Sequence, residues 1–158
     1  MRTDTGQVFR LEDYRPSDWL IPRTSLTFRL DPDRTRVVAE LTIERRDGVA
    51  PSTPLVLDGD GIALLAVSVD GEPLEAGSYE ATGQRLTLHK PPRGRTFQLT
   101  IETETAPSAN TALMGLYRSS GNYCTQCEAE GFRRITYFLD RPDVLSVYSV
   151  RIEARREE

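Results

Sequence analysis

The sequence predicts an all-β domain built as an open, mostly antiparallel sheet or sandwich. Short runs in which every second residue is apolar recur along the chain, and this is the period of a strand with one buried face. Turn residues separate the runs at intervals of roughly eight to twelve positions, as in sandwiches and open sheets. The 158 residues, of which 38% are hydrophobic and 28% charged, suit one domain that needs no disulfide or metal ion for stability.

The two clearest strands are expected at residues 25–30 and 37–43. In both, apolar side chains alternate with polar ones, so one face is expected to line a core and the other to meet solvent. Asp31-Pro32-Asp33 lies between them and places proline at the second position of a turn, where its fixed φ is favourable. The two strands are therefore expected to pair as an antiparallel hairpin.

Six further segments carry the strand pattern or part of it. One of them is followed by Asp70-Gly71, which is a strong signal for a two-residue hairpin loop. In the last segment, Tyr148, Val150 and Ile152 fall on one face. The six segments are residues 55–57, 62–69, 78–81, 85–89, 96–103 and 144–154.

The segments outside these strands are expected to be less regular. Residues 1–20 are expected to form a leading arm that Tyr14 and Trp19 hold against the body of the domain. Residues 107–122 are expected to form a loop with a few apolar anchors. A short helical turn is expected within residues 128–138, before a proline-containing segment ends it.

Charge and composition disfavour several classes of protein. The net charge of −4 gives no electrostatic reason to expect nucleic acid or an anionic membrane as a partner. No apolar run approaches the ~20 residues of a transmembrane helix, and the first ten residues lack the hydrophobic segment of a signal peptide. Two cysteines three positions apart suit a reducing compartment. A cytoplasmic location is therefore expected.

The stretch from Tyr123 to Asp143 departs from the strand pattern and is the candidate functional region. Polar and titratable side chains crowd into one short part of it, beside several aromatic residues. They are Cys124, Gln126, Cys127, Glu128, Glu130, Arg133 and Arg134. Such a segment suits neither a solvent-facing loop nor a core strand, and it is expected to form the wall of a site.

The Cys124-x-x-Cys127 pair allows a redox dithiol or half of a zinc site, but the rest of the sequence disfavours both. Redox pairs of this spacing precede a helix in a βαβ unit, and no such unit is expected here. A structural zinc ion needs four ligands, whereas the chain has no third cysteine and a single histidine, His89. Packed thiols and a surface imidazole at a strand end are the preferred interpretations.

Glu128 and Glu130, together with Gln126, leave two interpretations open. Acidic residues at alternate positions either decorate a solvated edge or converge on a cation. The flanking Phe132 and Phe138 favour a pocket slightly, because aromatic rings lower the local dielectric and strengthen the field of a carboxylate.

Three motifs in the second half of the chain carry a resemblance to a known family. They are Asn110-Thr-Ala-Leu-Met-Gly-Leu-Tyr117, Cys124-Thr-Gln-Cys-Glu-Ala-Glu-Gly-Phe-Arg133 and Tyr137-Phe-Leu-Asp-Arg-Pro-Asp143. The chain resembles the N-terminal domain of bacterial aminopeptidase N, in the M1 family of zinc metallopeptidases, over essentially its whole length. The resemblance implies a saddle-shaped, mostly antiparallel β domain that rests on a separate catalytic domain.

The resemblance also implies a substrate-binding role for Glu128 and Gln126. Glu128 matches a glutamate that helps to grip the free α-amino group of a peptide, and Gln126 matches a glutamine that lines the same pocket. No catalytic residue or metal ligand is expected in this chain, because the His-Glu-x-x-His motif of the family is absent from it. Zinc is expected only in the full-length enzyme, bound outside this chain.

These expectations make residues 1–158 a C-terminally truncated N-terminal domain without its catalytic domain. The chain alone is expected to be inactive, and its expected partners are a peptide substrate and its own catalytic domain. An exposed sheet edge is expected to allow pairing with a second copy. The alternatives are a free-standing β-sandwich interaction module, with residues 123–143 as a protein-binding loop, and a thiol redox module.

Overall fold

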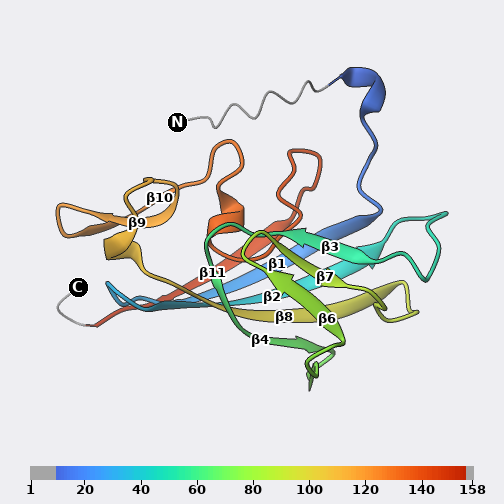
Figure 1. The fold of residues 1–158 in the computed structure, drawn as a ribbon, viewed down its shortest axis with the longest axis horizontal. Coiled ribbons are helices and arrows are strands. Elements are labelled where there is room, and N and C mark those ends of the chain that lie inside the picture. Colours follow the sequence, from blue (N-terminus) through green and yellow to red (C-terminus); the bar gives the residue numbers. More distant parts are fainter. Residues whose placement is uncertain (1–9, 156–158) are drawn as a thin grey trace.

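Strands make up about half of the computed structural model, which describes residues 10–155 (Figure 1). The strands are β1 (Trp19–Arg29), β2 (Thr35–Arg45), β3 (Leu55–Asp58), β4 (Ala63–Val69), β5 (Glu72–Pro73), β6 (Tyr79–Thr82), β7 (Arg85–Leu88), β8 (Thr96–Thr105), β9 (Gly115–Ser119), β10 (Asn122–Gln126) and β11 (Val147–Glu153). Three short 3-10 helices accompany them in the described range: η1 (Leu11–Asp13), η2 (Pro107–Ala109) and η3 (Phe132–Arg134). The predicted all-β fold is confirmed, and η3 is the helical turn expected within residues 128–138.

The strands form three sheets. The largest has the order β11-β1-β2-β8-β4-β5, and its neighbours are antiparallel except for β1 and β11, which run parallel. A second sheet has the order β3-β7-β6, and β9 and β10 form a two-stranded hairpin. Figure 1 shows the long strands of the large sheet as one curved layer, with the β9–β10 hairpin at one end of the molecule. The sheet is open and mostly antiparallel, as predicted.

The core lies between the large sheet and the β3-β7-β6 sheet. Leu41 and Ile101 of the large sheet are fully buried, and so are Leu57 and Leu86 of the small one. All four belong to one hydrophobic cluster. Because burial of each such side chain stabilises the fold by about 1.5–3 kcal/mol, the two layers hold each other in place.

β1 and β2 form the hairpin that the sequence predicts, with β1 longer than expected. Their burial alternates along most of their length, so every second side chain faces the core. β1 begins at Trp19, whose ring packs edge-on against Phe97 at a centroid distance of 5.9 Å. The Trp19 Nε1–H donates to the carbonyl oxygen of Pro54 at 3.0 Å. These contacts with distant segments explain why the strand extends beyond its alternating part.

The two-residue hairpin loop at Asp70-Gly71 is also confirmed. Val69 of β4 lies opposite Glu72 of β5, and Asp70 and Gly71 have φ angles of 51° and 86°. Two successive positive φ angles are the requirement of a type I′ turn, which favours Asp-Gly. The local sequence therefore determines this loop.

Residues 107–122 are not the loop that the sequence predicts, and that prediction is wrong. The segment contains η2, β9 and the first residue of β10. β9 has five residues, and Leu116 is the one large apolar side chain in it that is deeply buried. The strand therefore has no clear hydrophobic period in the sequence. The Asn110 side chain stabilises its start by donating Nδ2–H to the carbonyl oxygens of Met114 at 2.7 Å and Leu116 at 2.9 Å.

β11 is an edge strand of the large sheet and differs from the expected last strand. It is shorter than predicted, and it pairs in parallel with β1. Tyr148, Val150 and Ile152 share a face as predicted, but they are 48%, 54% and 65% exposed. Val150 lies opposite the buried Leu26. This face of β11 therefore continues the core side of β1, but other parts of the domain do not bury it.

The N-terminal arm is attached to the segment that follows η3. The Tyr14 hydroxyl donates to Asp143 Oδ2 at 2.8 Å, and Arg141 Nη2 donates to the carbonyl oxygen of Arg15 at 2.7 Å. Trp19 belongs to β1, and the part of the predicted arm in residues 1–9 lies outside the described residues. Within the described residues, no helix has the length and apolar character needed to cross a membrane.

Candidate functional site

The β9–β10 hairpin places Gln126 at the end of a strand. Gln126 is the last residue of β10 and lies opposite Gly115 of β9. Gly115 has a φ of +71°, and a Cβ added there would lie 2.6 Å from the Cβ of Arg134. Glycine is required at this position both for its conformation and for the close approach of β9 to η3.

A tight turn directly after β10 carries Glu128. The Gly131 N–H donates to the carbonyl oxygen of Cys127 at 2.8 Å and closes the turn. A Cβ at Gly131 would lie 2.8 Å from both Cys127 Cα and the Gln126 carbonyl oxygen, so any larger residue would force the turn open. The Gln126 Nε2 is 3.5 Å from the carbonyl oxygen of Glu128, at the limit of a hydrogen bond.

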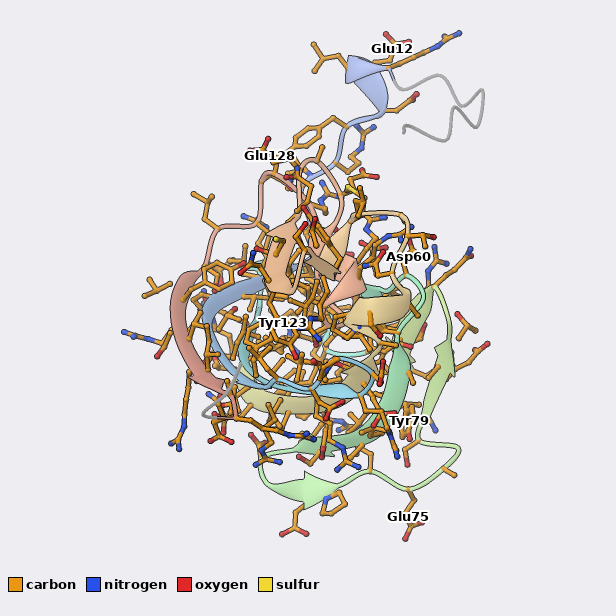
Figure 2. All side chains as sticks on the ribbon, turned by 90° about the vertical axis from the view of Figure 1, so that its left-hand side faces the viewer. Glu12, Asp60, Glu75, Tyr79, Tyr123 and Glu128 are labelled. Atoms are coloured by element: carbon orange, nitrogen blue, oxygen red, sulfur yellow. The ribbon has the colours of Figure 1, made fainter. Side chains whose placement is uncertain are left out.

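Glu128 lies at the rim of the molecule. Figure 2 shows it on the side of the N-terminal arm, at the opposite end from Glu75. The side chains of Gln126, Glu128 and Glu130 are exposed, whereas Gly131 is buried. The turn therefore presents its polar side chains outward and keeps its closing backbone inside.

Two neighbouring arginines of η3 anchor the other end of this turn. Arg133 Nε donates to Asp140 Oδ2 at 2.9 Å, and its Nη2 donates to the Asp140 carbonyl oxygen at 3.1 Å. Arg134 Nη2 contacts Asp60 Oδ2 at 2.7 Å, and the Asp60 N–H donates to the Arg133 carbonyl oxygen at 3.0 Å. η3 is thus fixed to the segment before the last strand and to the segment between β3 and β4.

The carboxylates near the turn and η3 differ in their pairing. Glu130 lies 3.7 Å from Arg133 Nη2, and Asp60 and Asp140 are paired as described above. Among residues 10–155, no side-chain hydrogen bond or ion pair of the Glu128 carboxylate is found. Burial acts to lower the pKa of Arg133, but its hydrogen bond to Asp140 and the nearby negative charges outweigh burial, and the net shift is upward.

The aromatic residues beside the turn pack beneath it and do not line an open pocket. Phe132 and Phe138 meet edge to face at 4.8 Å, and Phe138 is 3% exposed. Tyr137 is fully buried and donates its hydroxyl to the Thr82 carbonyl oxygen at 2.8 Å. A cavity of about 330 Å³ beside the Arg134–Asp60 pair has neither Gln126 nor Glu128 in its lining. The aromatic cluster therefore supports the turn from inside the domain.

The two cysteines are free, partly buried thiols. Burial, followed by the charge of Asp140, raises the pKa of Cys127. A redox cysteine needs a lowered thiol pKa, because the thiolate is the reactive form. The geometry therefore favours packed thiols over the redox alternative.

The described residues do not fit a metal site. His89 lies at the end of the β7 segment, where its Nε2 is 3.5 Å from a carboxylate oxygen of Glu80. Within residues 10–155, no group of three or more His, Cys, Asp or Glu side chains could hold a metal ion.

Several supporting residues of the site were not identified from the sequence. Gly131 lies within the segment where a helical turn is expected, and its role is to permit the tight turn after β10. Asn110 binds the start of β9 and Asp140 binds Arg133 of η3, although neither lies next to Glu128 in the sequence. The signal available for them was their presence in the family motifs, since no local pattern predicts a long-range contact.

Comparison with known proteins identifies the family. The model of the Peptidase M1 N-terminal domain matches residues 14–158. Aminopeptidase N of Caulobacter vibrioides is 56% identical over 154 residues, which are 98% of this chain and 17% of that protein. Aminopeptidase N of Escherichia coli is 46% identical over 152 residues, which are 96% of this chain and 17% of that protein.

Solved structures agree with this assignment. A Legionella pneumophila aminopeptidase A in complex with aspartic acid has a TM-score of 0.83 and 31% identity, over 91% of this chain and 17% of that one. A Deinococcus radiodurans M1 zinc metallopeptidase bound to a Tyr-Ser-Ala substrate has a TM-score of 0.70 and 20% identity, over 87% of this chain and 33% of that one, and so shares the fold. The chain spans 17% of the length of the curated relatives named here. It belongs to the M1 peptidase family and corresponds to the N-terminal domain of its aminopeptidases.

Proposed function

We propose that the chain is the substrate-anchoring N-terminal domain of a zinc-dependent aminopeptidase that removes N-terminal residues from peptides. In this proposal Glu128 binds the free α-ammonium group of the peptide, and Gln126 lines the same surface. The observation that carries the proposal is that the Glu128 carboxylate has no side-chain partner within residues 10–155, whereas Glu130, Asp140 and Asp60 each contact an arginine. Membership of the M1 family supports the assignment of the reaction class.

The chemistry of a carboxylate suits the recognition of a peptide end. A charge-assisted hydrogen bond between a carboxylate and an ammonium group contributes about 1.5–3 kcal/mol when water is largely excluded. An acylated N-terminus or an internal peptide bond offers no cation, so it would leave the carboxylate unpaired. Glu128 would thereby restrict the enzyme to free N-termini.

The catalytic zinc ion and its ligands would belong to another part of the longer enzyme. When bound there, zinc would supply the activated water that attacks the peptide bond. The residues described here would contribute binding and orientation of the peptide amine. We also infer a cytoplasmic enzyme, which the two free thiols support.

The proposal is tested by Glu128→Gln in an enzyme that carries this chain at its N-terminus. The expected result is a rise of about ten- to hundredfold in KM for an aminoacyl-anilide, because the lost interaction is worth about 1.5–3 kcal/mol. kcat is expected to fall as well, since the amine would be less well oriented. Steady-state kinetics measures both values.

Glu130→Gln is the matched control. Glu130 lies two positions away on the same turn and is equally exposed, but it already faces Arg133. Its replacement is expected to change KM by less than about twofold, since exposed ion pairs contribute little. Equal kinetics for Glu128→Gln and the unmodified enzyme would exclude the amine-binding role.

A free-standing interaction module remains the competing proposal, with residues 123–143 as its binding loop. Family membership favours the aminopeptidase domain over this alternative. The two proposals predict different coding sequences, because an aminopeptidase requires a His-Glu-x-x-His segment downstream of residue 158. Absence of such a segment from the reading frame would favour the interaction module.

A further inference from the structure

The contact between Arg133 and Asp140 is the most completely hydrogen-bonded ion pair near the Glu128 turn. The Arg133 backbone N–H and its Nε–H both donate to Asp140 Oδ2, at 3.2 Å and 2.9 Å. A third hydrogen bond runs from Arg133 Nη2 to the Asp140 carbonyl oxygen at 3.1 Å. The side chains are 22% and 11% exposed, so solvent screens this pair less than the surface pairs of the domain.

A short series of backbone contacts links this pair to Glu128. Arg133 is the central residue of η3, and the Arg134 N–H donates back to the Gly131 carbonyl oxygen at 3.1 Å. The Gly131 N–H in turn closes the turn onto Cys127 at 2.8 Å. Between these two hydrogen-bonded ends, residues 128–130 are exposed. Within residues 10–155 their side-chain contacts are two long ones, Glu130 with Arg133 at 3.7 Å and Gln126 Nε2 with the Glu128 carbonyl oxygen at 3.5 Å.

We propose that Arg133 and Asp140 are positioning residues that hold the Glu128 carboxylate at the place where it meets the peptide amine. The proposal rests on the proposed function of Glu128 and adds the pair that orients it. Neither residue touches the substrate in this proposal. Asp140 fixes η3, η3 fixes Gly131, and Gly131 fixes the C-terminal end of the turn.

The Arg134–Asp60 pair fits this role less well. It consists of one contact at 2.7 Å between side chains that are 32% and 42% exposed. The Asp60 N–H also donates to the Arg133 carbonyl oxygen at 3.0 Å. Arg133–Asp140 differs in the lower exposure of its side chains and in the hydrogen bond from the Arg133 backbone N–H to the Asp140 carboxylate.

Amide hydrogen exchange on the chain tests the physical part of the proposal without any catalytic activity. In Asp140→Ala, the Gly131 amide is expected to exchange at least about tenfold faster, while amides of β2 keep their protection. In Asp140→Asn, which keeps an oxygen acceptor for Arg133, the increase is expected to stay below about threefold. Unchanged Gly131 exchange in Asp140→Ala, or equal loosening of β2, would overturn the proposal.

Arg133→Lys provides a second variant if Asp140→Ala does not fold. It keeps the positive charge and the backbone donor and removes the guanidinium contacts. Faster exchange at Gly131 with an unchanged β2 is again the expected result. Exchange at Gly131 like that of the unmodified chain would contradict the proposal.

Kinetics in the longer enzyme tests whether this loosening acts through Glu128. Asp140→Ala is expected to raise KM for an aminoacyl-anilide by about tenfold, and to have no further effect in the Glu128→Gln background. Equal effects in both backgrounds would show that Asp140 acts elsewhere and would overturn the positioning role. If Glu128→Gln alone leaves KM unchanged, the proposed function fails, and the exchange result on Gly131 still decides whether the pair holds the turn.

Discussion

At the scale of single residues, Asp143 joins two parts of the chain that are distant in sequence. Its carboxylate accepts hydrogen bonds from Arg141 Nε and Nη2 at 2.8 Å and 2.9 Å, and from the Tyr14 hydroxyl at 2.8 Å. The hydrogen bond from Arg141 is the largest cause that lowers the pKa of Asp143, from 3.8 to about 2; partial burial opposes it, and Tyr14 adds to it. The same contact with Asp143 raises the pKa of Tyr14.

This lowered pKa predicts a dependence of stability on pH. A carboxylate with a pKa of 3.8 when unfolded and about 2 when folded stabilises the fold above pH 3.8, and the contribution disappears as pH falls towards 2. Asp143→Asn is therefore expected to lower the free energy of unfolding by about 1 kcal/mol at pH 6, after allowance for partial exposure. Denaturant unfolding of both proteins at several pH values measures the difference.

The difference between Asp143→Asn and the unmodified chain is expected to shrink below pH 4 and to vanish only below pH 2. Asp18→Asn, a change at an exposed position outside this network, is the matched control. A stability difference that stays constant from pH 6 to pH 2 would show that the charge of Asp143 does not stabilise the attachment of the arm.

At the scale of elements, β11 is an exposed edge strand of the large sheet. It is paired on one side only, with β1. Its core-side row of Tyr148, Val150 and Ile152 is about half exposed or more, whereas the opposing residues of β1 are buried. An exposed apolar edge strand offers unpaired backbone groups and a hydrophobic surface to another chain.

Self-association therefore stays a prediction, and the geometry indicates that the apolar row of β11 would form the contact. Val150→Lys places a charge in the middle of the apolar row and is expected to weaken self-association of the isolated chain by at least about tenfold. Ser149→Lys adds the same charge on the opposite face of β11 and is the control, with a smaller expected effect. Sedimentation velocity over a range of concentrations distinguishes the variants, and a monomeric unmodified chain would contradict the prediction.

At the scale of the whole molecule, the isolated chain is expected to have no peptidase activity. Hydrolysis by this family requires the His-Glu-x-x-His segment, and the sequence contains a single histidine. The purified chain, incubated with zinc and an aminoacyl-anilide, is expected to release product at the rate of the buffer control. Zinc-dependent turnover that copurifies with the chain and disappears on chelation would refute this expectation.

The sequence predicted those parts of the fold whose signal is local. The alternation in residues 37–43 and the Asp70-Gly71 loop are both present in the structure, because strand period and positive φ angles depend on neighbouring residues. The hairpin of β9 and β10 was missed, because it depends on Asn110 and on a glycine packed against Arg134. The parallel pairing of β11 was likewise not predicted, since no local pattern specifies a distant partner strand.

The sequence by itself determined the all-β class, the helical turn within residues 128–138 and the M1 resemblance, since each depends on residues close together in the chain. Only the tertiary structure decided which acidic residues near that turn are paired. Asp60 and Asp140 come from separate segments and bind Arg134 and Arg133, whereas Glu128 does not share these contacts. The sequence specifies which side chains are charged. Which of them pair depends on the segments that sheet packing brings within hydrogen-bonding distance of one another.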